Sequence, residues 1–203
     1  MDLFEHDARL RAQGHEPLAG LDEAGRGALA GPVVAAAVVL PGGAKVEGLK
    51  DSKLLSPRQR HRLLHKLLQV ALDVGVGLAH PEEIERLNVL GATRLAMQRA
   101  LENLTLRPAL LLIDALRLPQ VRCPQMSLLK GELKSASIAA ASVLAKCARD
   151  SIMLHYHGLW PQYGFDRHKG YCSRAHLQAL GVHGPCPVHR RGFRPVQSLQ
   201  PLF

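Results

Sequence analysis

The feature that most constrains the fold is an apolar run of nine residues, PVVAAAVVL, at positions 32–40. Because the run is continuous and rich in β-branched residues, it predicts a buried strand. Residues 18–22 form a shorter predicted strand before it. The glycine-bearing link between the two favours a hairpin with a wide turn or a bulge.

Helical and strand patterns follow one another along the rest of the chain. Ser56 and Pro57 have the residue types of a helix N-cap and a first helical position. The alanine-rich segment SASIAAASVLAKCARDSIMLHY predicts a long helix, capped by Ser135 or Ser137, that packs closely on a sheet. Further strands are expected at 72–79, 108–114 and 126–129, and further helices at 81–86 and 89–103. This order is typical of an α/β fold with a mixed sheet covered by helices, and the tail from Pro185 onward is expected to be irregular.

The charge of the chain indicates a polyanionic partner. The 203 residues carry a formal net charge of +9 and fit one domain with a sizeable core. Basic residues concentrate between Asp166 and Arg194, where Asp166 is the only acid. We interpret this segment as a surface that faces phosphate groups, in preference to an evenly basic surface that only aids solubility. Its basic members are Arg167, His168, Lys169, Arg174, His176, His183, His189, Arg190, Arg191 and Arg194.

Several other classes of protein are disfavoured by the sequence. No run of 18 apolar residues exists, so a membrane-spanning segment is not expected. The amino-terminal residues mix acids and bases and lack the apolar stretch of a signal peptide. The four cysteines are widely spaced and form no CxxC pair, which argues against a zinc site or a disulfide framework. A cytoplasmic protein with reduced thiols is the simpler interpretation.

Carboxylates stand where predicted strands end. Asp22 and Glu23 end the first strand, Asp114 ends a later one, and Glu132 follows another. Each alone fits a surface residue just beyond the core, but strand ends can converge on one edge of a sheet. Converging carboxylates repel one another unless cations hold them, and oxygen-only ligands favour Mg²⁺ or Mn²⁺. Two such ions about 4 Å apart activate water in phosphodiester cleavage, so the pattern predicts a metal-dependent nuclease.

Asp150 is a competing candidate for the fourth carboxylate. In a helix that begins near Ser135 it lies about 22 Å along the axis, at ~1.5 Å per residue. Glu132 lies just before that helix instead. We therefore expect Asp150 to be a structural ion-pair or capping residue.

Six segments of the chain, in order, resemble bacterial ribonuclease HII. They are GLDEAGRGALAGPVVAAAVVL, DSKLLS, LLIDA, KGELKSASIAAASVLAKCARD, PQYGFDRHKGY and HRRGF, and they span about residues 18–194. The resemblance implies a single ribonuclease H-like domain over residues 1–203, with a core at about 17–158 and a basic substrate-binding part at about 159–203. It also implies a cytoplasmic endonuclease that cuts the RNA strand of RNA–DNA hybrids and cuts 5′ of ribonucleotides embedded in duplex DNA.

The resemblance also implies which residues hold the metal. Asp22, Glu23, Asp114 and Glu132 correspond to four acids that bind the catalytic Mn²⁺ or Mg²⁺ ions. Water activated by two such ions would be the nucleophile, and cleavage would leave a 3′-hydroxyl and a 5′-phosphate.

Other positions correspond to substrate contacts in the family. Gly25, Arg26 and Gly27 match the segment that contacts the ribonucleotide at an RNA–DNA junction, where glycines allow close approach and the 2′-hydroxyl marks RNA. Tyr171 matches a tyrosine that packs against the adjoining sugar and base, an interpretation that we prefer to a core aromatic. Lys53 lies in a loop near the substrate backbone and is expected to contact a phosphate.

Two departures from the family pattern bear on the site. The fourth acid is usually Asp and is here Glu132, whose extra methylene moves the carboxylate by ~1.5 Å. The usual Gly-Asn after the strand Asp is here Ala115-Leu116, so a side-chain contact to substrate is absent or replaced. These departures leave open a nucleic-acid-binding protein with a lapsed active site. Ribonuclease HIII is disfavoured, because the seventeen residues before Leu18 are too few for that family's extra amino-terminal domain.

The carboxy-terminal residues QSLQPLF faintly resemble short peptides that dock on replication clamps. A tail that packs on the domain is the alternative. Nothing in the sequence demands a dimer, so a monomer is expected.

Overall fold

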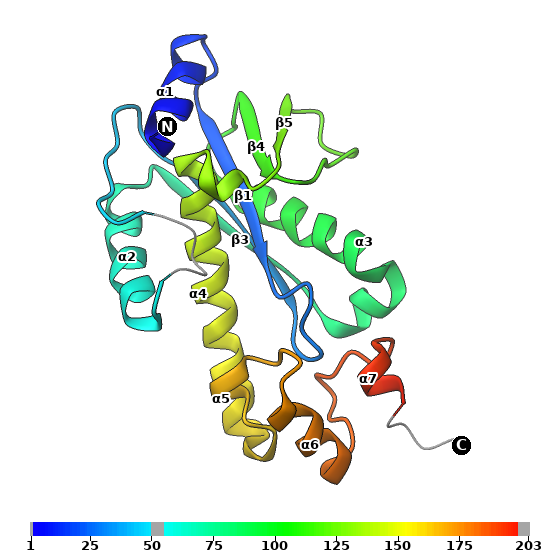
Figure 1. The fold of residues 1–203 in the computed structure, drawn as a ribbon. Coiled ribbons are helices and arrows are strands. Elements are labelled where there is room, and N and C mark those ends of the chain that lie inside the picture. The colour runs from blue at the N-terminus through cyan, green and yellow to red at the C-terminus, as the bar shows by residue number, and fades with distance from the viewer. Residues whose placement is uncertain (1, 50–54, 199–203) are drawn as a thin grey trace.

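The computed structural model describes residues 2–49 and 55–198 and contains a five-stranded mixed sheet (Figure 1). The strand order is β3-β2-β1-β4-β5. β1, β2 and β3 pair antiparallel, whereas β4 and β5 extend the sheet parallel to β1. The bounds are β1 Leu18–Ala24, β2 Val33–Val39, β3 Asp73–Ala79, β4 Leu110–Asp114 and β5 Gln125–Leu128. The mixed sheet and the hairpin expected from the sequence are confirmed.

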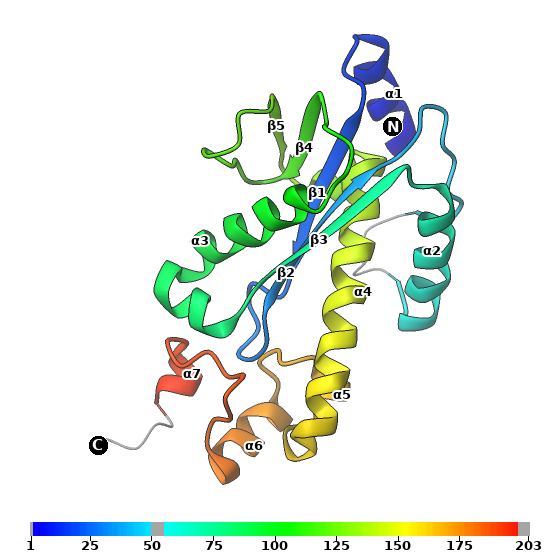
Figure 2. The same ribbon diagram turned by 180° about the vertical axis from the view of Figure 1, so that it is seen from behind.

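Helices cover both faces of this sheet, as Figures 1 and 2 show from opposite sides. α2 (Pro57–Val70) and α4 (Ala136–Leu159) lie on one face, and α3 (Pro81–Glu102) lies on the other. All seven residues of β2 are buried, with Ala36 on the α4 side and Ala35 on the α3 side. A strand covered on both faces tolerates no polar position, which accounts for the apolar run. Within the described residues, none of the helices has the length and apolarity needed to cross a membrane.

The helix ends follow the signals in the sequence. Ser56 caps α2 through a capping box with Gln59. Ser135, rather than Ser137, caps α4 by accepting a hydrogen bond from the Ile138 backbone N–H. α3 is kinked between its two predicted helical segments, because one residue, Asn88, has a φ of 57° and a ψ of 172°.

α1 (Leu3–Ala12) is a helix that the apolar pattern does not predict. It is held in place by Asp7, whose exposed fraction is 1%. The Asp7 carboxylate accepts hydrogen bonds from the backbone N–H and the hydroxyl of Ser137, each at 2.8 Å. The first helix is therefore bound to the amino end of α4 by a contact between residues that are 130 positions apart in the sequence.

α4 packs directly on β1 because both present small residues at their contact. Gly20 of β1 lies beneath the start of α4, and a Cβ there would stand 2.1 Å from the carbonyl carbon of Ser137. The close approach sets the amino end of α4 over the strand that carries Asp22 and Glu23. Five buried alanines line the helix, namely Ala136, Ala139, Ala140, Ala141 and Ala145.

The chain after α4 forms a small part of the fold with its own apolar cluster. It contains α5 (Phe165–His168), α6 (Arg174–His183) and α7 (Arg194–Gln197), preceded by a 3-10 turn at Pro161–Tyr163. The cluster joins Phe165 and Leu180 to Leu29 of the β1–β2 link. The expectation of an irregular tail from Pro185 onward is wrong at α7, where burial of Val196 accompanies a short helical turn.

Three residues of the basic segment lie inside this part of the fold. His176, His189 and Arg190 have exposed fractions of 0%, 1% and 0%. The interpretation of the whole segment as a phosphate-facing surface is therefore wrong for these three, because their polar groups hydrogen-bond within the protein. Arg167 and Arg174 do face solvent.

Candidate active site

Asp22 and Glu23 both belong to β1. The strand continues to Ala24, so the expectation that it ends at Asp22 is wrong. Alternation along the strand turns Asp22 toward α4, where its side chain hydrogen-bonds with that of Ser142. The backbone N–H of Glu23 donates to Asp22 Oδ1 at 2.7 Å. One carboxylate is thus held between β1 and α4 at a position where the sheet is fully covered.

The pKa of Asp22 lies well above the ordinary value for an aspartate. Burial is the main cause, since only 5% of the residue is exposed, and the negative charge of Glu23 acts in the same direction. Hydrogen bonds from Ser142 and from the Glu23 N–H oppose the shift, and the charge of Asp114 adds to it. Three carboxylates therefore interact electrostatically at one place, a situation that a bound cation would relieve.

Asp114 reaches this place through the neighbouring strand. Leu21 of β1 pairs with Ile113 of β4 in parallel register. The next residue on each strand, Asp22 or Asp114, therefore lies at the same level of the sheet. The prediction that strand-end acids converge is consistent with this register.

Glu132 is brought to the same edge by a short turn. Asp114 Oδ1 accepts a hydrogen bond from the backbone N–H of Gly131 at 2.8 Å, which fixes the 3-10 turn Gly131–Leu133 beside it. Glu132, within this turn, is 8% exposed. Among the described residues, no hydrogen-bond partner reaches its buried Oε2 atom.

The four acids present only oxygen ligands, the set that Mg²⁺ and Mn²⁺ prefer. Two observations fit a cation here: the unpartnered Oε2 of Glu132 and the burial of Asp22 beside two other negative charges. As they stand, however, no three His, Cys, Asp or Glu side chains of residues 2–49 and 55–198 form a group that could hold a metal ion. The assignment of the four acids as one ligand set therefore stays a proposal.

A hollow of about 190 Å³ opens beside Glu23 and contains most of the predicted substrate residues. Arg26 Nη1 lies 3.2 Å from Glu23 Oε1, and a β-bridge to Ala28 holds Tyr171 against the same loop. Lys53, also predicted to contact substrate, lies outside the described residues. The lining of the hollow is Glu23, Ala24, Gly25, Arg26, Gly27, Ser142, Lys146 and Tyr171.

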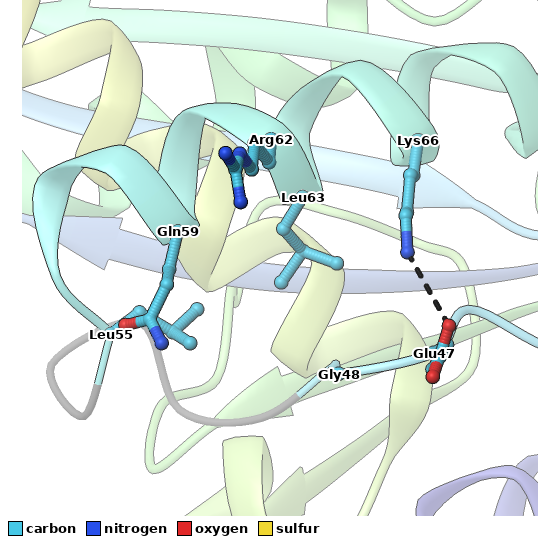
Figure 3. Close-up of a pocket in the computed structure, with 7 residues that line it drawn as sticks. All are labelled: Glu47, Gly48, Leu55, Gln59, Arg62, Leu63 and Lys66. Atoms are coloured by element: carbon cyan, nitrogen blue, oxygen red, sulfur yellow. Dashed lines mark ion pairs between the residues drawn. The ribbon is translucent and has the colours of Figure 1, made fainter.

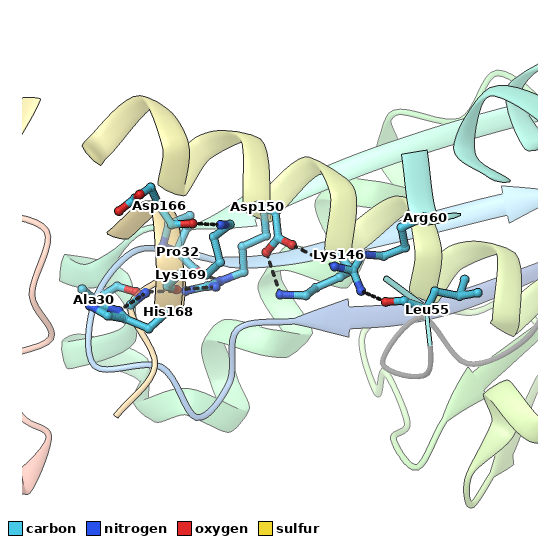
Figure 4. Close-up of polar contacts among 11 residues, drawn as sticks. Ala30, Pro32, Leu55, Arg60, Lys146, Asp150, Asp166, His168 and Lys169 are labelled. Atoms are coloured by element: carbon cyan, nitrogen blue, oxygen red, sulfur yellow. Dashed lines mark hydrogen bonds and ion pairs between the residues drawn. The ribbon is translucent and has the colours of Figure 1, made fainter. Parts of the chain in front are cut away.

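Lys146 is a member of this hollow that the sequence analysis does not single out. Its Nζ lies 5.5 Å from the centroid of the Tyr171 ring and 2.6 Å from Asp150 Oδ1. The spacing of four residues from both Ser142 and Asp150 places all three on one helix face, which is the signal that could have identified it. Asp150 is confirmed as an ion-pair residue, because Arg60 Nη2 also lies 3.5 Å from it (Figure 4).

A second hollow lies against α2 (Figure 3), and none of the four acids is in its lining. It has a volume of about 230 Å³, and Lys66 and Glu47 form an ion pair of 3.6 Å at its side. Its other lining residues are Gly48, Leu55, Gln59, Arg62 and Leu63. With a single acid in its lining, it offers no counterpart to the carboxylate site.

The fold and the site together define a class of protein. A mixed sheet that carries acids at one level of two adjacent central strands, beside a basic hollow, is the arrangement of a ribonuclease H-like nuclease. Comparison with known proteins then identifies the family. The sequence model of ribonuclease HII matches residues 19–196, and the chain belongs to the ribonuclease HII family. It is thus a hydrolase of the type 2 ribonuclease H class, with endonuclease activity on nucleic acid.

Relatives with the same name cover nearly the whole chain. The ribonuclease HII of Desulfitobacterium hafniense is 50% identical over 196 residues, which are 97% of this chain and 75% of that protein. The ribonuclease HII of Idiomarina loihiensis is 48% identical over 182 residues, which are 90% of this chain and 97% of that protein.

Solved structures share the fold. The ribonuclease H2 of Pyrococcus horikoshii OT3 superposes with a TM-score of 0.76 at 26% identity, covering 90% of this chain and 96% of that one. A chain of the PCNA:RNase HII complex from Archaeoglobus fulgidus gives 0.72 at 21% identity, covering 92% and 98%. Bst-RNase HIII in complex with Mn²⁺ gives 0.68 at 20% identity, covering 90% and 68%. The expected ribonuclease H-like fold is confirmed.

Proposed function

We propose that the protein cuts the RNA strand of RNA–DNA hybrids and cuts 5′ of ribonucleotides embedded in duplex DNA. The observation that carries this proposal is that Glu23 belongs to two sites at once. It adds negative charge beside Asp22, and it lines the hollow that contains Gly25, Gly27 and Tyr171. Groups suited to recognise a sugar therefore adjoin groups suited to hold metal at the neighbouring phosphodiester.

Asp22, Glu23, Asp114 and Glu132 would hold the divalent ions, Mn²⁺ or Mg²⁺. Their all-oxygen donor set and their mutual repulsion support this role, as does the Mn²⁺ held by Bst-RNase HIII. Two such ions, when bound, would activate water and stabilise the leaving oxygen, so that cleavage would leave a 3′-hydroxyl and a 5′-phosphate. The protein's own part is placement: hydrogen bonds from Ser142 and from the Glu23 N–H favour the charged form of Asp22.

Gly25, Arg26, Gly27 and Tyr171 would recognise the ribonucleotide. Gly25 has a φ of 97°, and the place of a Cβ on Gly27 is open, so the backbone can approach a sugar closely. A 2′-hydroxyl within reach of that backbone would distinguish RNA from DNA. The half-buried ring of Tyr171 offers a face for the adjoining sugar and base. Arg26 and, outside the described residues, Lys53 would contact phosphates.

The remaining expectations about partners and location stay proposals. A replication-clamp contact through the QSLQPLF tail finds support in the solved complex of an archaeal ribonuclease HII with PCNA. Residues 199–203 of that tail lie outside the described residues. We also retain a cytoplasmic monomer and a single domain, with a core at about 17–158 and a substrate-binding part at about 159–203.

The test is a cleavage assay on an RNA–DNA hybrid and on duplex DNA with one ribonucleotide, each with Mg²⁺ and with Mn²⁺. We expect both to be cut with the stated ends and an all-DNA duplex to stay intact. Asp22→Asn should abolish cutting but not binding, because the buried carboxylate is lost. Asp150→Asn, which changes an acid of the ion-pair network on α4, serves as the control and should still cut. Binding without cutting under both metals would favour the lapsed active site instead.

A further inference from the structure

Two arginine side chains are buried near the hollow, and neither forms a salt bridge with another described residue. Arg149 of α4 and Arg190 after α6 each have an exposed fraction of 0%. Among the described residues, neither lies within ion-pair distance of a carboxylate. Burial of an unpaired cation is costly, and it lowers the pKa of Arg190 to about 9. A fold that retains two such groups needs contacts that only they make.

Arg149 donates hydrogen bonds to three backbone carbonyls from two separate segments of the chain. Its Nε donates to the carbonyl of Pro32 at 3.0 Å and its Nη2 to that of Ala30 at 2.9 Å, both in the link between β1 and β2. Its Nη1 donates to the carbonyl of Lys169 at 2.9 Å, in the segment that leads to Tyr171. One guanidinium group therefore joins the β1–β2 link to the chain after α5.

Arg149 also contacts residues that line the hollow itself. Its guanidinium carbon lies 5.1 Å from the centroid of the Tyr171 ring, a cation–π distance. A Cβ on Gly25 would stand 2.0 Å from Arg149 Nε, so only glycine fits there. The position of Arg149, together with the φ of 97°, thus accounts for glycine at position 25, and the same side chain supports the Tyr171 ring.

Arg190 holds the other side of the same link. Its Nε donates to the carbonyl of Gly31 at 2.9 Å and its Nη1 to that of Arg26 at 2.9 Å. Its backbone N–H donates to the carbonyl of Leu29 at 2.8 Å. Because Arg190 holds the Arg26 carbonyl, the peptide between Arg26 and Gly27 has a defined orientation at the hollow.

We propose that Arg149 and Arg190 are positioning residues that set the Gly25–Gly27 backbone and the Tyr171 ring for recognition of a ribose. The inference rests on the proposed function, since it assigns ribose recognition to that hollow. Arginine suits the task because its planar fork offers five donors at fixed angles, whereas lysine could satisfy the separate carbonyls only in part. Loss of either fork would leave loop carbonyls unpaired and free the backbone that faces the sugar.

The experiment measures binding rather than cleavage. Dissociation constants are determined in EDTA for duplex DNA with one ribonucleotide and for the all-DNA duplex of the same sequence. The wild-type protein should prefer the ribonucleotide. Arg149→Lys and Arg190→Lys should reduce that preference roughly tenfold, about the effect of one lost hydrogen bond, while affinity for all-DNA duplex changes little. A purely structural role would lower thermal stability and leave the ratio of the two constants unchanged.

Arg99→Lys is the matched control, because Arg99 binds Glu83 and the Leu78 carbonyl on the opposite face of the sheet. It should retain the wild-type preference. Should a lysine variant fail to fold, the matching glutamine variant removes the buried charge, keeps two donors and carries the same expectation. Folded variants that keep the preference overturn the inference and leave the proposed function standing. A wild-type protein without any preference overturns ribose recognition in this hollow and the inference with it.

Discussion

The Oε2 atom of Glu132 is buried, and no partner among the described residues reaches it. A buried carboxylate oxygen without a donor destabilises a folded protein, because it has lost its hydration and gained nothing in return. The same atom is well suited to accept a cation. At this residue, the feature that lowers the stability of the metal-free protein is the one that would favour metal binding.

Glu132→Gln should lower the cleavage rate strongly and leave the melting temperature unchanged or higher, because the amide keeps the shape and removes the buried charge. Glu132→Asp should keep or raise activity, since it restores the acid that is usual in the family. Initial cleavage rates and thermal unfolding of both variants provide the measurement. A fully active Glu132→Gln protein would exclude Glu132 from the site.

Ala115, directly after Asp114, has a φ of 50°, in the left-handed region that disfavours a residue with a Cβ. This conformation suits the glycine that the family resemblance leads one to expect at this position. Ala115→Gly should raise the free energy of unfolding by up to about 1 kcal/mol. The relief of strain in the folded protein outweighs the extra conformational entropy that glycine gives the unfolded chain. Urea unfolding measures the change. Ala175→Gly, at an exposed position in α6, is the control and should cost about 0.5–1 kcal/mol.

At the scale of elements, α6 and the loop after it share a chain of neutral histidines. His176 Nδ1 donates to the backbone carbonyl of Tyr171 at 2.9 Å, so its Nε2 is an acceptor. His189 Nε2, 3.0 Å away, must then donate to it, and His189 Nδ1 accepts from the Cys186 backbone N–H at 3.0 Å. Burial is the main reason that the pKa of each ring falls to about 4.

The two neutral histidines, His176 and His189, lead us to expect a loss of stability at acid pH. The unfolded histidines bind protons below about pH 6.5, whereas the folded ones do so only below about 4. The contribution is therefore complete above pH 6.5 and is lost as the pH falls toward 4, by at most about 3 kcal/mol per ring. Urea unfolding from pH 7 to 4.5 should show a shallower decline for His189→Gln than for the wild-type protein. The exposed His61→Gln is the control, and equal slopes for all three would contradict the assignment.

Elements could be predicted where a local signal marks them. Ser56 and Ser135 stand at caps, and the break near Asn88 separates two apolar patterns. α1 could not be predicted, because its place depends on the tertiary contact of Asp7 with Ser137. The burial of Arg190 was equally hidden, since its partners are backbone carbonyls that lie far away in the sequence.

At the scale of the whole molecule, positive charge continues beyond the hollow beside Glu23. A neighbouring hollow of about 210 Å³ is lined by Arg60, Lys146, Arg167 and Lys169, and also by Asp150, which pairs with Arg60 and Lys146. It shares Lys146 with the first hollow. A duplex with one strand at the acids would therefore meet further cations toward the carboxyl end of α4.

Arg167→Ala should weaken duplex binding for every sequence and reduce the slope of log affinity against log salt by about 1, the signature of one lost phosphate contact. Its side chain is 87% exposed, so the fold should be unaffected. Titrations at several salt concentrations measure the slope. Arg9→Ala, in α1 near the amino end of α4, should leave it unchanged. An unaltered slope for Arg167→Ala would place that residue outside the duplex interface.

Individual residues of the candidate site could be predicted from the sequence, but the way in which the fold brings them together could not. Asp22 and Asp114 follow apolar strands, and the parallel register that aligns them depends on the strand order, which no local pattern encodes. Lys146 lacked a local signal of its own beyond helical spacing. The support of Tyr171 by Arg149 depends on a fold that joins segments before and after α4.

The bond between Asp7 and Ser137 joins residues that are 130 positions apart. A ribosome adding ~5–20 residues per second needs on the order of ten seconds to make that stretch. During this time the nascent amino-terminal helix has no partner for its carboxylate, and β1 has no α4 to cover its glycine. The contact that fixes the first helix can therefore form only late in synthesis, after the start of α4 has been made.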